Sequence, residues 1–238
     1  MPGLGTAINV ATIIVGTGVG LLVGGRIPER ARTTVLQSVG LVVLVVGVSQ
    51  ALRSDNIVFP LVSVVIGALV GEAVGIEDRL ESLGDRIRRR VERPPDTAPN
   101  EAPEENTFVE GFVAASLLFC VGPLAVLGSI ADGLEGDIGL LAVKAALDGL
   151  VSIVFAATLG WGVAFSALPV LVYQGALTLL AGSADSVLSE RMVLEGTATG
   201  GIMVLGISMR LLDLKQVRVG SLLPALVIAP VLVALFAR

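Results

Sequence analysis

Residues 139–164 read GLLAVKAALDGLVSIVFAATLGWGVA, and Lys144 and Asp148 are the only charged residues in this apolar stretch. A helix needs about 20 predominantly apolar residues to cross the hydrocarbon core of a bilayer. The stretch is longer than this, so it predicts a membrane-spanning helix. Its two charges would then lie at membrane depth, where ionisable side chains are costly.

Seven further apolar segments surround this one in the chain. We therefore predict an all-α protein, a polytopic transmembrane helix bundle of about eight spans, with seven as the alternative. The short polar gap near Ser166–Pro169 leaves open whether the fifth and sixth spans are full spans or a re-entrant pair. The other segments are residues 1–25, 33–52, 57–76, 107–131, 168–182, 192–209 and 219–237.

The composition agrees with a membrane protein. Hydrophobic residues make up 54% of the chain, charged residues 16%, and the mean hydropathy is +0.88. The net charge of −5 resides mainly in the loops and gives no reason to expect a nucleic-acid partner. No positively charged leader precedes the first apolar segment, so we expect no cleavable signal peptide.

The basic residues predict the orientation. Lys and Arg near the ends of spans stay in the cytoplasm, and three segments carry most of them. We expect these segments in the cytoplasm, and both termini and the acidic segment Asp132–Asp137 outside. The basic residues concerned are Arg26, Arg30, Arg32, Arg79, Arg86, Arg88, Arg89, Arg90, Arg93, Arg210, Lys215 and Arg218.

A polar segment divides the chain into spans 1–3 (residues 1–76) and spans 4–8 (residues 107–238). Within it, Glu77–Arg93 has a stripe of apolar residues at helical spacing and predicts an amphipathic cytoplasmic helix. This helix either extends the third span or lies at the interface, where its arginines would contact anionic lipid. Residues 96–106 have no apolar period and predict a flexible linker.

Glycines recur every four residues in two spans and form flat helix faces on which another backbone can pack closely. Packing within the chain and a homo-oligomer interface remain alternatives. The glycines are Gly16, Gly20 and Gly24 in the first span, Gly67, Gly71 and Gly75 in the third, and a pair in the seventh, Gly196 and Gly200.

Two short segments resemble each other. Residues 45–49 (VVGVS) in the second span match residues 204–208 (VLGIS) in the seventh, and each is followed by a turn and a proline-containing span. Pairing spans 1–3 with spans 6–8 would give an inverted repeat, which is typical of secondary transporters.

Lys144 and Asp148 are the strongest candidates for a functional site. Residues four apart share one face of a helix, so the two side chains predict an ion pair. The pair either fixes the rotation of its helix or forms a substrate or ion site in which Lys144 is a counter-charge that a ligand can displace.

Other polar features lie at similar depth. Gly122 and Pro123 break the fourth span, since proline removes a backbone hydrogen bond, and Ser129 follows. Gln174 lies near the middle of the sixth span and offers two donors and an acceptor. These residues either satisfy packing needs or join Lys144 and Asp148 in one midplane site.

Glu72, Glu110 and Glu195 are weaker candidates, because each lies within about two turns of the end of a span and can reach the interface. The chain has no histidine, which excludes imidazole metal sites, and Cys120 is its one cysteine, which excludes an intramolecular disulfide. We find no Walker loop, nucleophile elbow or dinucleotide fingerprint. We expect neither an enzyme nor a cofactor or metal.

Long blocks of the sequence resemble a known family. The chain is similar, over nearly its whole length, to the YdfK/YqgA-like family, domain of unknown function 554. The resemblance implies a multi-pass inner-membrane protein of a bacterium or archaeon and implies no activity. The blocks are 5–10 (GTAINV), 108–133 (FVEGFVAASLLFCVGPLAVLGSIADG), 144–149 (KAALDG), 165–182 (FSALPVLVYQGALTLLAG), 198–201 (ATGG) and 222–225 (LLPA).

Two functions from different classes follow. The first is a secondary transporter or channel for an ion or small polar solute, with its site at the midplane. The second is a non-transporting scaffold or assembly protein whose buried polar residues are structural. The expected partners are the lipid bilayer, a small solute or ion, and a second copy of the chain.

Overall fold

The computed structural model describes residues 2–25, 28–80, 82, 107–181 and 188–236, and all regular structure within these ranges is helical. The predicted helix at Glu77–Arg93 begins as expected, with residues 76–80 helical, but its remainder and the predicted linker lie outside the described residues. The elements are α1 (Leu4–Gly24), α2 (Glu29–Ala51), α3 (Val58–Val74), α5 (Thr107–Cys120), α6 (Pro123–Glu135), α7 (Gly139–Leu159), the 3-10 helix η1 (Gly160–Ser166), α8 (Ala167–Leu179), α10 (Glu190–Leu211), the 3-10 helix η2 (Val219–Leu222) and α11 (Ala225–Phe236).

The helices form a polytopic bundle, as the sequence predicts. In the described ranges, five helical segments are long and apolar enough to cross a membrane, or six if the bent pair α5 and α6 is one span. The prediction of about eight counts the shorter α3 as a span and divides 139–179 into two. The two helices of the bent pair contact different neighbours. Gly133 on α6 packs on Thr178 near the end of α8, and Gly111 on α5 packs on Leu159 at the end of α7.

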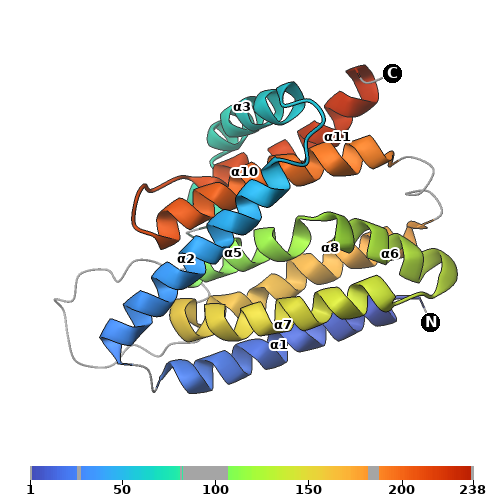
Figure 1. The fold of residues 1–238 in the computed structure, drawn as a ribbon. Coiled ribbons are helices and arrows are strands. Elements are labelled where there is room, and N and C mark those ends of the chain that lie inside the picture. Colours follow the sequence, from blue (N-terminus) through green and yellow to red (C-terminus); the bar gives the residue numbers. More distant parts are fainter. Residues whose placement is uncertain (1, 26–27, 81, 83–106, 182–187, 237–238) are drawn as a thin grey trace.

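The first glycine face packs within the chain. Helices α1 and α7 lie side by side along one edge of the bundle and run in the same direction (Figure 1). A Cβ on Gly20 would lie 2.8 Å from the Cβ of Ala156, and one on Gly24 would lie 2.7 Å from the Ala157 carbonyl oxygen. A Cβ on Gly16 would likewise overlap the Gly149 carbonyl oxygen. Van der Waals contact at short range therefore joins these helices, as expected in lipid.

Helices α2, α3, α10 and α11 form the other side of the bundle (Figure 1). The two segments matched in sequence lie against each other, because a Cβ on Gly47 would meet the side chain of Leu205 at 2.9 Å. The Ser208 hydroxyl donates to the Gly40 carbonyl at 2.8 Å. Whether the halves form an inverted repeat stays a prediction.

The second glycine face is shorter than predicted. A Cβ on Gly67 would lie 2.6 Å from the Ala225 nitrogen, and one on Gly71 would overlap the Ser221 carbonyl, so both glycines pack on the segment from η2 to α11. Gly75 does not belong to this face. It ends α3 with a left-handed backbone (φ 68°), a conformation that glycine adopts without a Cβ penalty.

The fourth apolar segment is broken, as Gly122 and Pro123 predict. Helices α5 and α6 meet at an angle of 59°. Gly122 has φ 135° and ψ 154°, a region that other residues rarely enter, and Pro123 is the first residue of α6. The break turns the chain in mid-bundle and places the end of α5 beside α7.

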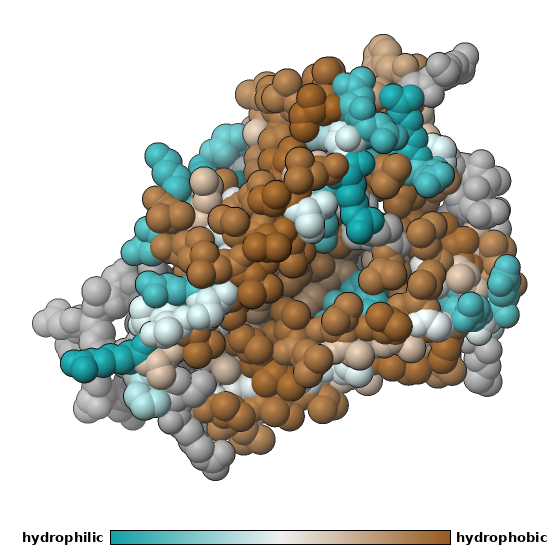
Figure 2. All heavy atoms as spheres, viewed as in Figure 1, coloured by the Kyte–Doolittle hydropathy of each residue, from teal (hydrophilic) through white to brown (hydrophobic). Residues whose placement is uncertain are grey.

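The outer surface is apolar over most of the face in Figure 2. Large hydrophobic side chains are exposed along the outward sides of α1, α2, α3, α7 and α8, including Leu69 at 68% and Leu150 at 63%. A soluble protein rarely exposes so continuous a hydrophobic surface. The helices therefore face lipid, and the polar groups gathered between them require a separate explanation.

Candidate functional site

Four polar side chains from three helices meet inside the bundle. Asp148 is near the middle of α7, and Lys144 one turn earlier forms an ion pair with its Oδ2 atom. Asn9 on α1 donates its Nδ2 hydrogens to the same Asp148 Oδ2 at 3.0 Å and to Gln174 Oε1 on α8 at 3.3 Å. We call Asn9, Lys144, Asp148 and Gln174 the polar cluster.

The polar cluster is shielded from the outside. Asn9 and Gln174 are 0% exposed, Lys144 is 5% exposed and Asp148 is 7% exposed. Taking two charges out of water costs several kcal/mol per ion, and their attraction offsets that cost only with good geometry and further hydrogen bonds. Asn9 supplies one such bond to Asp148, so the pair depends on the docking of α1 on α7.

The polar cluster keeps unused hydrogen-bonding capacity. Asn9 Oδ1 and Gln174 Nε2 are buried and have no hydrogen-bond partner among the described residues. Both described bonds to Asp148 end on Oδ2, which leaves Oδ1 of the carboxylate without a described partner. Asp148 sets the orientation of the Asn9 amide, because a carboxylate only accepts hydrogen bonds and the amide nitrogen is the donor. Three hydrogen-bonding atoms thus remain unused: an acceptor on Asn9, an acceptor on Asp148 and a donor on Gln174.

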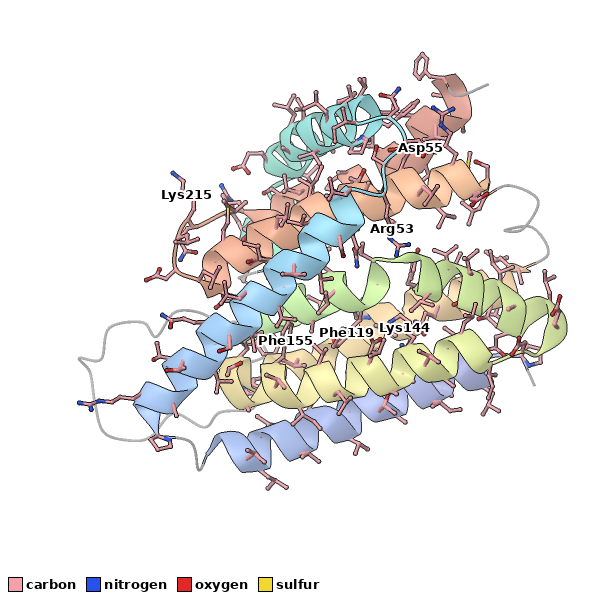
Figure 3. All side chains as sticks on the ribbon, in the orientation of Figure 1. Arg53, Asp55, Phe119, Lys144, Phe155 and Lys215 are labelled. Atoms are coloured by element: carbon pink, nitrogen blue, oxygen red, sulfur yellow. The ribbon has the colours of Figure 1, made fainter. Side chains whose placement is uncertain are left out.

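The broken end of α5 lies beside the polar cluster. The Lys144 Nζ atom is 5.9 Å from the centre of the Phe119 ring, and these two residues lie at the centre of the bundle (Figure 3). Cys120, the last residue of α5, is in electrostatic range of Lys144 and Asp148. Tyr173, next to Gln174 in the chain, lines a cavity of about 390 Å³ together with Cys120 and Gly122.

The structure brings together some of the predicted site residues and not others. Lys144, Asp148 and Gln174 meet in the polar cluster, whereas Gly122 lines the cavity, whose lining includes none of the four cluster residues. Ser129 on α6 is fully buried and its hydroxyl has no partner, but no described bond joins it to the cluster. Asn9 was not among the predicted residues, although a lone asparagine in an apolar span is a usable signal.

Glu195 has a structural role at the end of α10. Its carboxylate is 0% exposed and accepts hydrogen bonds from the Ser54 hydroxyl at 2.6 Å and from the backbone nitrogens of Asp55 and Asn56 at 3.1 and 3.0 Å. It therefore holds the α2–α3 connection against α10. Whether Glu195 also lies at a membrane interface stays a prediction.

Glu72 and Glu110 lie at the other end of the bundle. Glu72 is half exposed and forms an ion pair with Arg218, which also pairs with Asp78. Glu110 lies 4.0 Å from Arg210, which binds Glu77 at 3.1 Å. These ion pairs join α3, α5 and α10 near their ends, away from the polar cluster.

Asp132 differs from its predicted position in an external loop. It belongs to α6, is 0% exposed and accepts hydrogen bonds from the backbone nitrogens of Gly3 and Gly5 at 3.1 and 3.2 Å. A carboxylate at this place binds the unpaired N–H groups that begin a helix and complements the helix dipole. Asp132 therefore positions α1, and with it Asn9.

The described ranges contain groups that can bind a ligand. No group of three or more His, Cys, Asp or Glu residues there is placed to hold a metal ion. The polar cluster has one carboxylate, one ammonium and two amides, which suits a small charged or polar ligand.

Comparisons with known proteins agree with the predicted resemblance. The chain is 38% identical over 128 residues to the uncharacterized membrane protein YdfK of Bacillus subtilis (strain 168), a match that covers 54% of this chain and little more than half (56%) of YdfK. It is 27% identical over 226 residues to the uncharacterized protein YqgA of Escherichia coli (strain K12), covering 95% of this chain and 94% of YqgA.

No solved structure matches the chain. A family model described as "Protein of unknown function (DUF554)" matches residues 4–234. The long blocks that suggested the resemblance, including those around Asn9, Asp148 and Gln174, fall inside this range. The chain therefore belongs to the DUF554 family of proteins of unknown function.

Proposed function

We propose that this protein is a secondary transporter or channel for an ion or small polar solute, and that the polar cluster is its binding site. The observation that carries the proposal is a pair of buried polar atoms without a described partner, Asn9 Oδ1 and Gln174 Nε2, in the network that holds the Lys144–Asp148 ion pair. Buried polar atoms are usually paired, and unpaired ones in the same network as a buried charge support a ligand site.

The depth of the cluster supports transport rather than surface binding. Asp148 lies near the middle of α7, whose 21 residues span about 31 Å at 1.5 Å per residue. Irregular backbone inside a membrane is tolerated where protein buries it or where it lines a cavity. The break between α5 and α6 is irregular backbone of this kind, and it lies next to Lys144 through Phe119.

A scaffold or assembly protein is the second candidate. The close packing of Gly16 and Gly20 on α7 and the bonds of Glu195 show that buried residues in this chain also serve structure. In a scaffold, the Lys144–Asp148 pair would only fix the rotation of α7. The two proposals differ in whether a solute binds to the polar cluster.

Thermal unfolding of the purified protein in detergent tests the proposal, with a panel of inorganic ions and small polar metabolites. A ligand present at one hundred times its dissociation constant adds about 2.7 kcal/mol to the stability of the folded protein. In a chain of this size, that corresponds to a rise in melting temperature of roughly 5–11 °C. The solute should act on the wild type and lose its effect in Asp148→Asn.

Asp137→Asn is the matched control, because Asp137 is an exposed acid near the beginning of α7. We expect this variant to respond to the solute as the wild type does. If every solute leaves the wild type unchanged, or if Asp148→Asn responds fully, the binding site is wrongly assigned and the scaffold becomes the better account.

The orientation is part of the proposal. We infer a cytoplasmic membrane location with both termini outside, on the basis of the basic residues near the ends of the spans. The thiol of Asp137→Cys should then react with an impermeant thiol reagent added to intact cells. The thiol of Asp213→Cys should react only after the membrane is opened. The reverse pattern would show that both termini lie in the cytoplasm.

A further inference from the structure

We propose that the ligand of the polar cluster is a monovalent inorganic cation. It takes the place of the Lys144 ammonium on Asp148, while that ammonium turns to the open carbonyl end of α5. The inference rests on the proposed function and goes beyond it by naming the class of ligand and the group that makes way for it.

The charges of the polar cluster favour exchange over addition. Lys144 and Asp148 form a neutral pair, and both lie in a nearly closed interior. An added anion or cation would leave a net charge there, which is costly without a partner. A monovalent cation that replaces the ammonium leaves Asp148 neutralised, and the extra positive charge then resides on the displaced Lys144, which needs a second partner in the interior. A divalent ion would need a second carboxylate for charge balance, and Asp148 is the one carboxylate of the polar cluster.

The free atoms near Asp148 suit a hard cation. Asp148 Oδ1 and the buried Asn9 Oδ1 are oxygens without a described partner, and Gln174 presents its Oε1 to Asn9. Carboxylate and amide oxygens are the ligands that hard cations prefer. The two unpaired oxygens repel an anion and favour a cation, and Gln174 Nε2 is the one unused donor beside them.

The displaced ammonium has a second place to bind. The last four carbonyls of a helix have no partner within it and carry a partial negative charge. At the break, the last carbonyls of α5 lack the backbone N–H donors that would follow in a continuous helix. Pro123 has no N–H, and the Ala125 N–H bonds to the Gly122 carbonyl at 3.2 Å. The carbonyls concerned are those of Leu118, Phe119 and Cys120, because the Leu117 carbonyl accepts the Val121 N–H at 2.9 Å.

Lys144 already lies beside the side chain of Phe119, the second-last residue of α5. Its Nζ atom lies 5.9 Å from the Phe119 ring, within the range in which an aromatic face attracts a cation. Phe119 is 0% exposed, so the ammonium would move between two buried positions without entering water. Asp148 on one side and the end of α5 on the other are then alternative partners of one lysine.

Lys144→Met tests the exchange directly. The variant removes the competing ammonium and leaves Asp148 in place. We would purify it in sodium or potassium chloride, transfer it to N-methyl-D-glucamine chloride at equal ionic strength, and titrate lithium, sodium, potassium and ammonium chloride against the melting temperature. We expect one or more of these cations to raise the melting temperature saturably, with half-saturation at a concentration at least tenfold lower than in the wild type.

Lys144→Met/Asp148→Asn is the matched control, because it has the same altered α7 without the carboxylate. It should show no cation-specific response. A response that persists in this double variant, or a Lys144→Met protein indifferent to all four cations, overturns the exchange. If a neutral or anionic solute still stabilises the wild type through Asp148, the proposed function stands while this inference fails. If no solute acts on either protein, both fail.

Discussion

Lys144→Met will lower the melting temperature by roughly 6–20 °C when N-methyl-D-glucamine is the only cation in the buffer. Removing one partner of a buried ion pair costs about 3–5 kcal/mol, because the other charge stays buried and uncompensated, and a chain of this size loses about 2–4 °C per kcal/mol. In Lys144→Met the uncompensated charge is the Asp148 carboxylate, whose one remaining described side-chain donor is the Asn9 amide. The measurement is thermal unfolding in detergent.

The double variant makes this prediction specific to the pair. Asp148→Asn alone should also destabilise the protein, whereas Lys144→Met/Asp148→Asn should recover part of the loss, since two neutral side chains leave no unpaired charge. Lys215→Met is the matched control, because Lys215 is exposed in the α10–α11 connection (Figure 3). Additive losses in the double variant would show that the two charges do not depend on each other.

Gly20→Ile will separate α1 from α7 and destabilise the protein by about 3 kcal/mol, the upper end of the usual cost of overpacking. A Cβ on Gly20 would overlap the Ile153 carbonyl and lie 2.8 Å from the Ala156 Cβ. Backbone atoms cannot rotate away as a side chain can, so the helix itself must move. The expected fall in melting temperature is about 6–12 °C.

Gly18→Ile separates this clash from the effect of adding isoleucine to a helix. Gly18 lies in the same helix, and a Cβ there would meet nothing within 4 Å. It should change stability by no more than about 0.5 kcal/mol. Because α1 carries Asn9, Gly20→Ile should also weaken the solute response proposed for the polar cluster. Equal melting temperatures for the two variants would mean that α1 does not pack on α7 as described.

Local patterns were sufficient for several features. The spacing of Lys144 and Asp148 predicts their ion pair, because residues four apart on a helix are neighbours whatever surrounds them. Gly122 followed by Pro123 predicts the break, because proline lacks the N–H that the helix needs. Gly16 and Gly20 predict a close helix contact, although the spacing does not say whether the partner is α7 or a second chain.

Other features depend on contacts between residues far apart in the chain. Asn9 meets Asp148 across 139 residues and Gln174 across 165. Asp132 looks like a loop acid until α1 is placed on it, and the bonds of Glu195 to the α2–α3 connection have no signal in the sequence around it. Gly75 fits a four-residue repeat, but its left-handed backbone ends α3 instead.

The sequence by itself determined that this protein is a helical membrane protein of the DUF554 family, that its charges cluster between spans, and that one lysine and one aspartate pair inside an apolar helix. These are properties of hydropathy and of helix periodicity, which act over a few residues. Only the tertiary structure decided that Asn9 and Gln174 join Lys144 and Asp148 in the polar cluster and that Phe119, near the broken end of α5, lies beside Lys144. Those relations arise from helix packing, and packing is set by the shapes of surfaces that no single segment contains.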